Sequence, residues 1–437
     1  MRDQHRALLL GCVLVFIGSC KKDVDENAPN VRIVAPNEGY SLSVPDTLAI
    51  RVEVEDDRIV ERLVIAVTNE FGVPIAPPIA VDVNATSATL EQALVLIDER
   101  ITSGHYTIMA YADDGTNEKR DFVGITIQAA LLRLRALFVA PPVSTPPPYT
   151  INRIDSVGAV SDWTTVSEYN GAVIDPQTKH LILAGGVHQP LTALPTDAGI
   201  SSWTVPNQNG TGASLPYFLG LCLDPEDGRC YFGTDDGLIR GFTGSGQQQF
   251  NAQALANYRS YGTAVLGDLL VSHQEENILG TYRLVTYASS SGVLQTSFPL
   301  DLETVALFRR SDDQALTFGN RAGEGVIQDR NVVLGGNFEM RIFSEGIIAS
   351  VVRLNTSTWV IALPGRLVRF DYPSNGISEL ATGITATTMA YEPATGSLYV
   401  GSGNNITVMD PQTGTITGSL SMSGPVGSIL PLLNRRP

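Results

Sequence analysis

The side chains that could do acid–base, metal or nucleophilic chemistry are few and widely spaced in this sequence. Four of its five histidines follow residue 19, namely His105, His180, His188 and His273. No two of them stand at metal-ligand spacing, and the patterns His-Glu-x-x-His, Cys-x-x-Cys and Gly-x-Ser-x-Gly are absent. No glycine-rich loop leads into a helix to hold a phosphate. We therefore predict no catalytic residue, no metal centre and no cofactor from motifs alone.

Two cysteines, Cys222 and Cys230, flank a predicted turn. If Asp224 pairs with Arg229 across that turn, Cys222 lies opposite Tyr231. The alternation of side chains along a strand then points the two thiols to opposite faces of the sheet, which disfavours a disulfide. We expect free thiols, although a register shifted by one residue would permit the bond in an oxidising compartment.

The N-terminus has the pattern of an exported protein. Arg2 and Arg6 precede an apolar run over residues 7–17, which is shorter than the roughly 20 residues that span a bilayer. The run ends in Ile17-Gly18-Ser19-Cys20, which resembles a bacterial lipobox. The resemblance implies a signal peptide over residues 1–19 and lipidation of Cys20. The alternative is an ordinary cleaved signal with a chance cysteine.

Residues 20–28 are predicted to be a linker. The segment Lys21-Lys22-Asp23-Val24-Asp25-Glu26 resembles the export tag of surface lipoproteins in the Bacteroidota, and a solvated linker is the alternative. These resemblances imply a lipid-anchored protein of the outer membrane, on its periplasmic or cell-surface side. Removing Arg2, Arg6 and Asp3 with the signal changes the net charge from −16 to −17. Such a charge argues against a nucleic-acid partner and makes the lipid the means of membrane attachment.

A recurring turn organises the second part of the chain. It occurs as Asp175-Pro176-Gln177-Thr178-Lys179, Asp224-Pro225-Glu226-Asp227-Gly228 and Glu392-Pro393-Ala394-Thr395-Gly396. Proline presets φ early in the turn, and glycine supplies a positive φ at its end. Because Lys179 stands where the other copies have glycine, we expect that turn to be strained.

The spacing of these turns counts the repeats. Asp224 and Glu392 are 168 residues apart, or four steps of 42, and a degenerate copy at Arg310 is 82 residues before Glu392. Short strands at this period predict a β-propeller, and residues 131–434 hold about seven units. We predict seven blades, the first of which is closed by a C-terminal strand over residues 428–433.

Residues 29–128 are predicted to form a first, all-β domain. Strands are expected over residues 30–34, 48–54, 62–68, 105–112 and 122–127. The turn pattern resembles bacterial immunoglobulin-like modules, which implies a β-sandwich. Its acidic residues Asp56, Asp57, Asp113 and Asp114 could bind Ca²⁺, or they are solvated turn residues.

The repeat also carries a family resemblance. Leu398-Tyr399-Val400-Gly401 and Asp410-Pro411-Gln412-Thr413-Gly414 resemble the YVTN family of propellers and, more distantly, quinoprotein-like ones. Tryptophans occur only at positions 163, 203 and 359, out of phase with the repeat that accompanies pyrroloquinoline quinone, so that cofactor is not expected. Lipid-anchored propellers of this class include proteins that capture corrinoids beside an outer-membrane transporter.

One face of the propeller is predicted to bind a ligand. It combines loops between second and third strands with residues at the start of innermost strands, where aromatic, amide and carboxylate groups suit a glycan or another organic molecule. The candidates are Tyr169, His188, Tyr217, Asp235, Asp236, Tyr261, His273, Asn320, Arg321 and Asn404.

We favour a surface protein that binds such a ligand for uptake, with a transporter as a further partner. One alternative is a lactonase- or lyase-like enzyme that uses His273 with Glu275 or Glu276. The other is a scaffold that binds only proteins.

Overall fold

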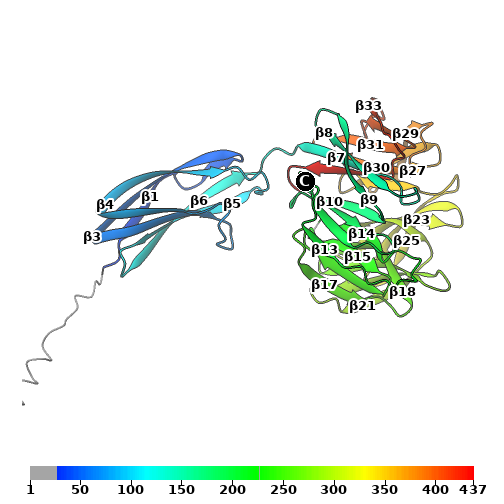
Figure 1. The fold of residues 1–437 in the computed structure, drawn as a ribbon, viewed down its shortest axis with the longest axis horizontal. Coiled ribbons are helices and arrows are strands. Elements are labelled where there is room, and N and C mark those ends of the chain that lie inside the picture. The colour runs from blue at the N-terminus through cyan, green and yellow to red at the C-terminus, as the bar shows by residue number, and fades with distance from the viewer. Residues whose placement is uncertain (1–26, 226) are drawn as a thin grey trace, which may run out of the picture. The chain divides into compact units, whose positions relative to one another are not determined.

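The computed structural model describes residues 27–225 and 227–437, and every regular element in that part of the chain is a β-strand. The chain divides into a first compact unit that ends at Ala130 and a second over Leu131–Pro437 (Figure 1). No helix in the described ranges is long and apolar enough to cross a membrane. The predicted signal peptide and Cys20 lie outside these ranges.

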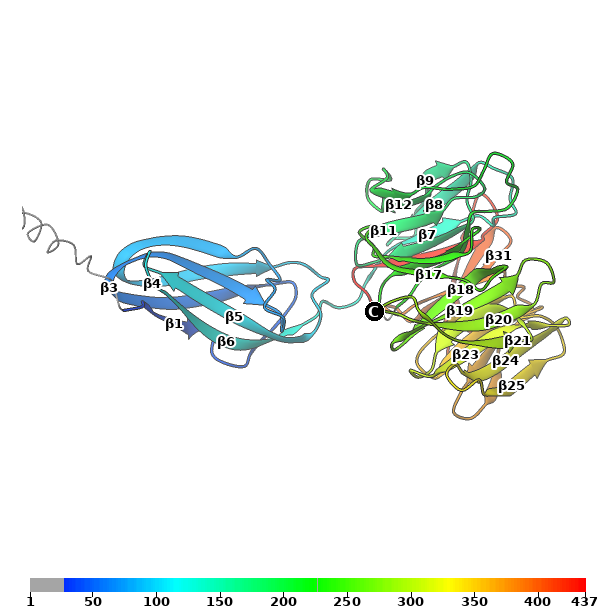
Figure 2. The same ribbon diagram turned by 90° about the horizontal axis from the view of Figure 1, so that it is seen from below.

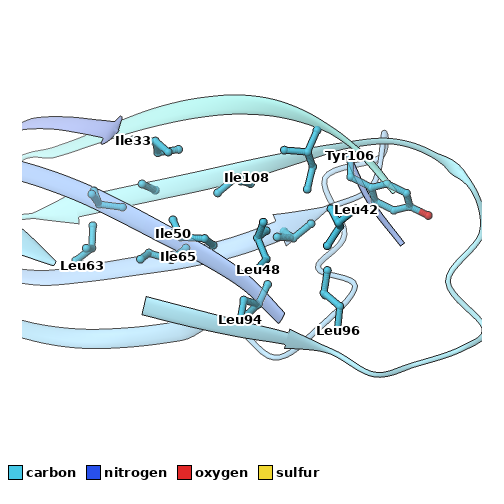
Figure 3. Packing of buried hydrophobic residues seen from close by; sticks show 14 of the residues in the cluster. Ile33, Leu42, Leu48, Ile50, Leu63, Ile65, Leu94, Leu96, Tyr106 and Ile108 are labelled. Atoms are coloured by element: carbon cyan, nitrogen blue, oxygen red, sulfur yellow. The ribbon is translucent and has the colours of Figure 1, made fainter. Parts of the chain in front are cut away.

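The first unit is one hydrogen-bonded sheet wrapped around a single core. Its strands are β1 (Asn30–Ala35), β2 (Tyr40–Ser43), β3 (Asp46–Thr68), β4 (Ile79–Leu96), β5 (Gly104–Asp113) and β6 (Glu118–Gln128). Their order is β1-β3-β5-β6-β2, and β4 also pairs with β3. Alternate residues of β3 such as Ile50 and Val52 are buried while Arg51 is exposed, as the pattern predicted. Ile50 packs with Leu48, Leu63 and Ile108 inside the unit (Figure 3).

One prediction for this unit was wrong, and the strands β2 and β4 were not predicted. Residues 48–54 and 62–68, expected as separate strands, belong to the single strand β3, whose register with β4 shifts between Glu55 and Arg62. Irregular pairing of this kind lets a long strand bend without a turn. The 18-residue β4 was missed because its polar and small residues are mostly exposed or half-buried on a strand paired along one edge.

The bend in β3 changes the geometry of the acidic residues. The carboxyl group of Asp56 accepts a hydrogen bond from Asp57 N at 2.8 Å and lies close enough to Asp114 for the two charges to interact. Asp114 also accepts hydrogen bonds at 2.7 Å from the N–H groups of Thr116 and Asn117. One carboxylate oxygen on each aspartate, Oδ2, is buried without a hydrogen-bond partner. Asp56 and Asp114 therefore form a close pair.

The second unit consists of seven four-stranded sheets (Figures 1 and 2). Listed from first to fourth strand, the first four sheets are β34 (Ser428–Leu433), β7 (Leu134–Ala140), β8 (Tyr149–Asp155), β9 (Val160–Val166); β10 (Gly171–Asp175), β11 (His180–Ala184), β12 (Leu191–Pro195), β13 (Trp203–Val205); β14 (Phe218–Leu223), β15 (Cys230–Thr234), β16 (Leu238–Phe242), β17 (Gln248–Gln253); and β18 (Tyr258–Leu266), β19 (Leu269–Glu276), β20 (Tyr282–Ala288), β21 (Leu294–Leu300).

The remaining three sheets continue the same pattern. They are β22 (Glu303–Arg309), β23 (Gln314–Arg321), β24 (Glu324–Asn331), β25 (Asn337–Phe343); β26 (Ser350–Arg353), β27 (Thr358–Leu363), β28 (Arg366–Asp371), β29 (Gly376–Thr382); and β30 (Thr388–Glu392), β31 (Ser397–Ser402), β32 (Asn405–Met409), β33 (Ile416–Ser421). The first strands contact one another in the closed order β34, β10, β14, β18, β22, β26, β30 and back to β34. Four-stranded sheets whose first strands form a ring define a β-propeller.

The two ends of the second unit meet in one sheet. β34 pairs antiparallel with β7, with Leu430 opposite Phe138, which is the pairing that the sequence predicted. The side chain of Asn434 then binds the backbone on the other side of the closure. Its Oδ1 accepts a hydrogen bond from Arg133 N at 2.8 Å, and its Nδ2 donates to Leu131 O at 3.0 Å.

The recurring turns join first to second strands, as predicted, and they need a left-handed residue. Gly228 has φ +67° and Gly396 has φ +71°, and Lys179 takes φ +55° at the matching position. The acidic residue that opens each turn is buried and accepts hydrogen bonds from the backbone. Asp224 Oδ2 accepts from Val265 N on β18 at 2.7 Å, so this turn also joins neighbouring sheets.

The cysteines behave as the sequence predicted. Cys222 lies opposite Tyr231, Leu223 lies opposite Cys230, and both thiols are free. Burial raises the pKa of Cys222 to about 11, so its thiol stays protonated at neutral pH.

Candidate functional site

Backbone hydrogen bonds join the loops between second and third strands to the starts of the first strands, on one face of the propeller. Asp235 N, in the loop between β15 and β16, donates to Tyr217 O just before β14 at 2.8 Å. Tyr217 N donates to Gly186 O in the corresponding loop of the preceding sheet at 3.2 Å. Asn277 N, after β19, donates to Asn257 O before β18 at 2.9 Å. We call this the loop face.

A β-bulge shapes the loop face at the start of β18. Ser260 pairs with Gln274 and Gly262 pairs with His273, so Tyr261 between them has no partner on β19. A bulge bends its strand and redirects the side chain of the extra residue. The Tyr261 side chain is accordingly 40% exposed within an innermost strand.

Around Tyr261 lies a group of charged and phenolic side chains. Glu275 on β19 lies between Arg259 on β18 and Tyr282 on β20, each directly opposite it in the sheet. Arg259 forms an ion pair with Asp235 at 2.7 Å. Glu303, the first residue of β22, acts electrostatically on both Glu275 and Tyr282. We call this set the acidic tyrosine cluster. It consists of Asp235, Arg259, Tyr261, Glu275, Tyr282 and Glu303.

The cluster shifts the protonation of its own members. Burial raises the pKa of Glu275, the negative charge of Glu303 raises it further, and Arg259 opposes both effects. Burial and then the charge of Glu275 raise the pKa of Tyr261. Burial, followed by the charges of Glu275 and Glu303, raises the pKa of Tyr282. These shifts follow first from burial and then from carboxylates placed close together with a single arginine among them.

His273 lies beside the cluster, not in the loop where the sequence placed it. It belongs to β19, is 4% exposed, and its ring centre is 5.3 Å from that of Tyr282. Burial lowers the pKa of His273 to about 4, so the imidazole is neutral at pH 7. Its Nε2 atom is buried and has no hydrogen-bond partner in the described part of the chain.

Three other predicted residues are packed or bonded within the fold. Tyr169 is 5% exposed, and its ring lies 5.7 Å from that of Tyr149. Tyr217 is 1% exposed and donates a hydrogen bond to Asp236 Oδ2 at 3.2 Å. Asp236 also accepts a hydrogen bond from Thr234 Oγ1. Tyr169 and Tyr217 therefore support the loop face from below and do not present their rings on it.

The remaining predicted residues lie apart from the cluster. Asn320 and Arg321 are the last residues of β23 and do not lie in a loop. Asn320 Oδ1 accepts a hydrogen bond from Ile348 N at 2.7 Å, and its Nδ2 donates to Ile348 O at 3.0 Å. Arg321 is neutralised by Asp301 and by Glu339, the latter at 2.6 Å.

His188 and Asn404 lie in exposed loops of other sheets. His188 N donates to Glu168 Oε2 at 2.7 Å, and Asn404 O accepts from Met422 N at 2.8 Å.

Sequence reasoning missed Arg259, Tyr282 and Glu303 as members of the site. Arg259 and Tyr282 become neighbours of Glu275 only through strand pairing, which depends on the bulge at Tyr261. Glu303 belongs to the next sheet, 28 residues further along the chain than Glu275. The one signal available was the spacing Tyr258-Arg259-Ser260-Tyr261 at the start of a predicted innermost strand.

Several hollows lie elsewhere, and two of them include predicted residues or aromatic side chains in their lining. One of about 470 Å³ in the first unit is lined by Phe71, Ile75 and Tyr106, among others. One of about 250 Å³ in the second unit is lined by Thr164, Glu168 and Gln189, among others. Because Glu168 accepts hydrogen bonds from the N–H groups of His188 and Gln189, its carboxylate is already satisfied by the loop.

Comparison with known proteins yields structural similarity only. No model of a protein family matches the chain, and no curated protein is significantly similar to it. The chain is similar to a solved quinonprotein alcohol dehydrogenase-like protein from Bacteroides thetaiotaomicron, with 12% identity, coverage of 93% of this chain and 100% of that one, and a TM-score of 0.48. Apo AztD from Citrobacter koseri is similar at 13% identity, 68% and 98% coverage, and a TM-score of 0.47. These values carry no conclusion about function, and the propeller assignment rests on the strand topology.

Proposed function

We propose that this chain is a lipid-anchored outer-membrane protein that binds an organic ligand on the loop face for uptake. In this proposal Cys20 carries the lipid, residues 29–128 are an immunoglobulin-like sandwich, and residues 131–434 are a seven-bladed propeller. The ligand is a glycan, a corrinoid or a similar molecule, and an outer-membrane transporter receives it.

The acidic tyrosine cluster is the observation that supports ligand binding. Tyr261 is exposed on a bulge of an innermost strand, so its ring does not contribute to the core and is available to a ligand. Aromatic rings beside polar groups bind sugars and planar molecules, because the ring stacks while the polar groups fix orientation. The loop after β19 also exposes Ile278 and Leu279.

The enzyme alternative requires a proton carrier at the cluster. His273 and Glu275 are two residues apart on β19 and point to the same side of the sheet. No hydrogen bond joins them among the described residues, and His273 Nε2 is unpartnered. The protein-scaffold alternative would use the same exposed surface.

Binding can be measured by titration calorimetry on the chain from Lys21 onward, which keeps both units. The ligands would be cello- and chito-oligosaccharides and cyanocobalamin. We expect one class to bind and Tyr261→Ala to weaken that binding about tenfold, which corresponds to about 1.4 kcal/mol and is within the range for an aromatic contact. Tyr40→Ala is the matched control, because Tyr40 is similarly exposed at 46% in the first unit.

Two results would contradict the proposal. Binding that Tyr261→Ala leaves unchanged would move the site away from the cluster. No binding by any of these ligands would favour the scaffold alternative. Mass spectrometry of the recovered ligand separates binding from catalysis, because a chemically altered ligand would establish the enzyme alternative.

A further inference from the structure

We infer that the loop face recognises an organic ligand through a positively charged amine, which Glu275 and Glu303 bind between the rings of Tyr261 and Tyr282. The inference rests on the proposed function and specifies the chemistry of its ligand. It depends on the charge balance of the cluster, on the two rings and on an unpartnered imidazole, which are independent observations.

The charge balance of the cluster is negative, because three carboxylates share one arginine. Arg259 is committed to Asp235 at 2.7 Å. Within the described ranges, the side chains of Glu275 and Glu303 form neither a hydrogen bond nor an ion pair. Acidic groups on the neighbouring sheet are neutralised instead, as Asp301 is by Arg330 at 2.9 Å. Asp235, Glu275 and Glu303 share the single positive charge of Arg259, so an additional bound cation would stabilise the cluster.

The rings make an organic cation the better match. Tyr282 lies directly opposite Glu275, and Tyr261 is exposed beside the same carboxylate. An ammonium group gains from the negative face of an aromatic ring as well as from a carboxylate. A bare Ca²⁺ ion needs six to eight oxygen ligands. The described residues contain no group of three His, Cys, Asp or Glu side chains suited to a metal.

His273 gives a second, independent indication of a ligand. Its imidazole is 4% exposed, its Nε2 is unpartnered, and it shares one side of β19 with Glu275. Its ring lies against that of Tyr282, so the buried imidazole contacts the cluster through this tyrosine. A buried polar atom left without a partner costs free energy, which a hydrogen bond to a ligand would recover. Burial keeps this imidazole neutral, so it does not repel a cation.

The test compares probes that differ only in the charge of their amines. Glucosamine trimer and trilysine are each titrated calorimetrically against their N-acetylated forms, with the chain from Lys21 onward. We expect at least one amine form to bind ten or more times tighter than its acetylated partner, and its affinity to fall as salt rises. Glu275→Gln and Glu303→Gln should each remove most of that preference, whereas Glu91→Gln, which removes the same charge from the first unit, should not.

The outcomes are separable. If neutral ligands bind through Tyr261 while neither amine is preferred, the inference fails and the proposed function stands. If no amine or neutral probe binds, both fail. If Ca²⁺ binds at Glu275 and Glu303 and the amines do not, the inference also fails. Thermal unfolding of each Gln variant checks that the fold is intact, and retained neutral binding in a folded variant assigns its loss of amine preference to charge.

Discussion

A single backbone angle separates otherwise equivalent turns of the propeller. Lys179 occupies the left-handed region at φ +55°, where the other copies have glycine. That conformation costs an L-residue about 1–2 kcal/mol. Replacing the lysine by glycine recovers only part of this free energy, because glycine makes the unfolded chain more flexible. We expect Lys179→Gly to stabilise the second unit by about 0.5–1 kcal/mol, measured by denaturant unfolding.

The reciprocal change is a matched control. A Cβ added at Gly396 (φ +71°) would meet no atom within 4 Å, so Gly396→Ala tests backbone strain without a clash. It should destabilise the unit by about 1 kcal/mol. Equal stability of the wild type and both variants would show that these turns tolerate either residue and that the strain argument is wrong.

The pair Asp56 and Asp114 makes the first unit sensitive to pH. Burial raises the pKa of Asp56, and the charges of Asp57 and Asp114 add to the rise. A carboxyl group whose folded pKa is raised stabilises the fold below its unfolded pKa of about 3.9, and this contribution is lost as pH increases through the folded pKa. Above the folded pKa of Asp56, the variant Asp56→Asn should therefore be more stable than the wild type. The difference should be less than about 1 kcal/mol, because the site is near solvent.

Thermal unfolding with a chelator between pH 4 and 8 measures this difference, with Asp82→Asn on the exposed side of β4 as a control for lost charge. The Ca²⁺ hypothesis is tested by repeating the unfolding without the chelator, and it predicts that Asp56 stabilises the unit when Ca²⁺ is present. Added Ca²⁺ should stabilise the wild type at pH 7 and leave Asp56→Asn unchanged, because the asparagine supplies a weaker ligand. A wild type that does not respond to Ca²⁺ would dismiss this site.

Among the strands, the ring closure by β34 concentrates stability in one residue. Asn434, near the end of the second unit, is 2% exposed. Its side chain binds Arg133 N and Leu131 O at the start of that unit. Asn434→Ala removes two hydrogen bonds to the backbone, at about 0.5–1.5 kcal/mol each. We expect a lower unfolding midpoint for the second unit, whereas Asn404→Ala in an exposed loop should change it by less than about 0.5 kcal/mol. A neutral Asn434→Ala would show that the β34–β7 ladder alone closes the ring.

Strands were predictable where local pattern and packing agree. The turn at Asp224 fixed the register that puts Cys222 opposite Tyr231, because a short turn allows one pairing. The path of β3 through Asp56 was not predictable, since acidic residues indicate a turn and only pairing with β4 shows a continuous strand. Asp235, Tyr261 and Glu275 were named singly, but their grouping with Glu303 was missed for the same reason: a bulge and two adjacent sheets join these residues, which no short sequence window contains.

At the scale of the whole molecule, the proposed attachment to the membrane depends on Cys20. A net charge of −17 after removal of the signal repels anionic lipid surfaces, so basic residues do not supply the affinity. Acyl chains contribute about 0.8 kcal/mol per buried CH₂, and more than one chain gives stable anchoring. In a Gram-negative host, we expect the wild type to incorporate labelled palmitate and to sediment with membranes, and Cys20→Ser to lose both properties. Cys12→Ser, within the predicted signal, should behave as the wild type, and membrane-bound, unlabelled Cys20→Ser would contradict lipid anchoring.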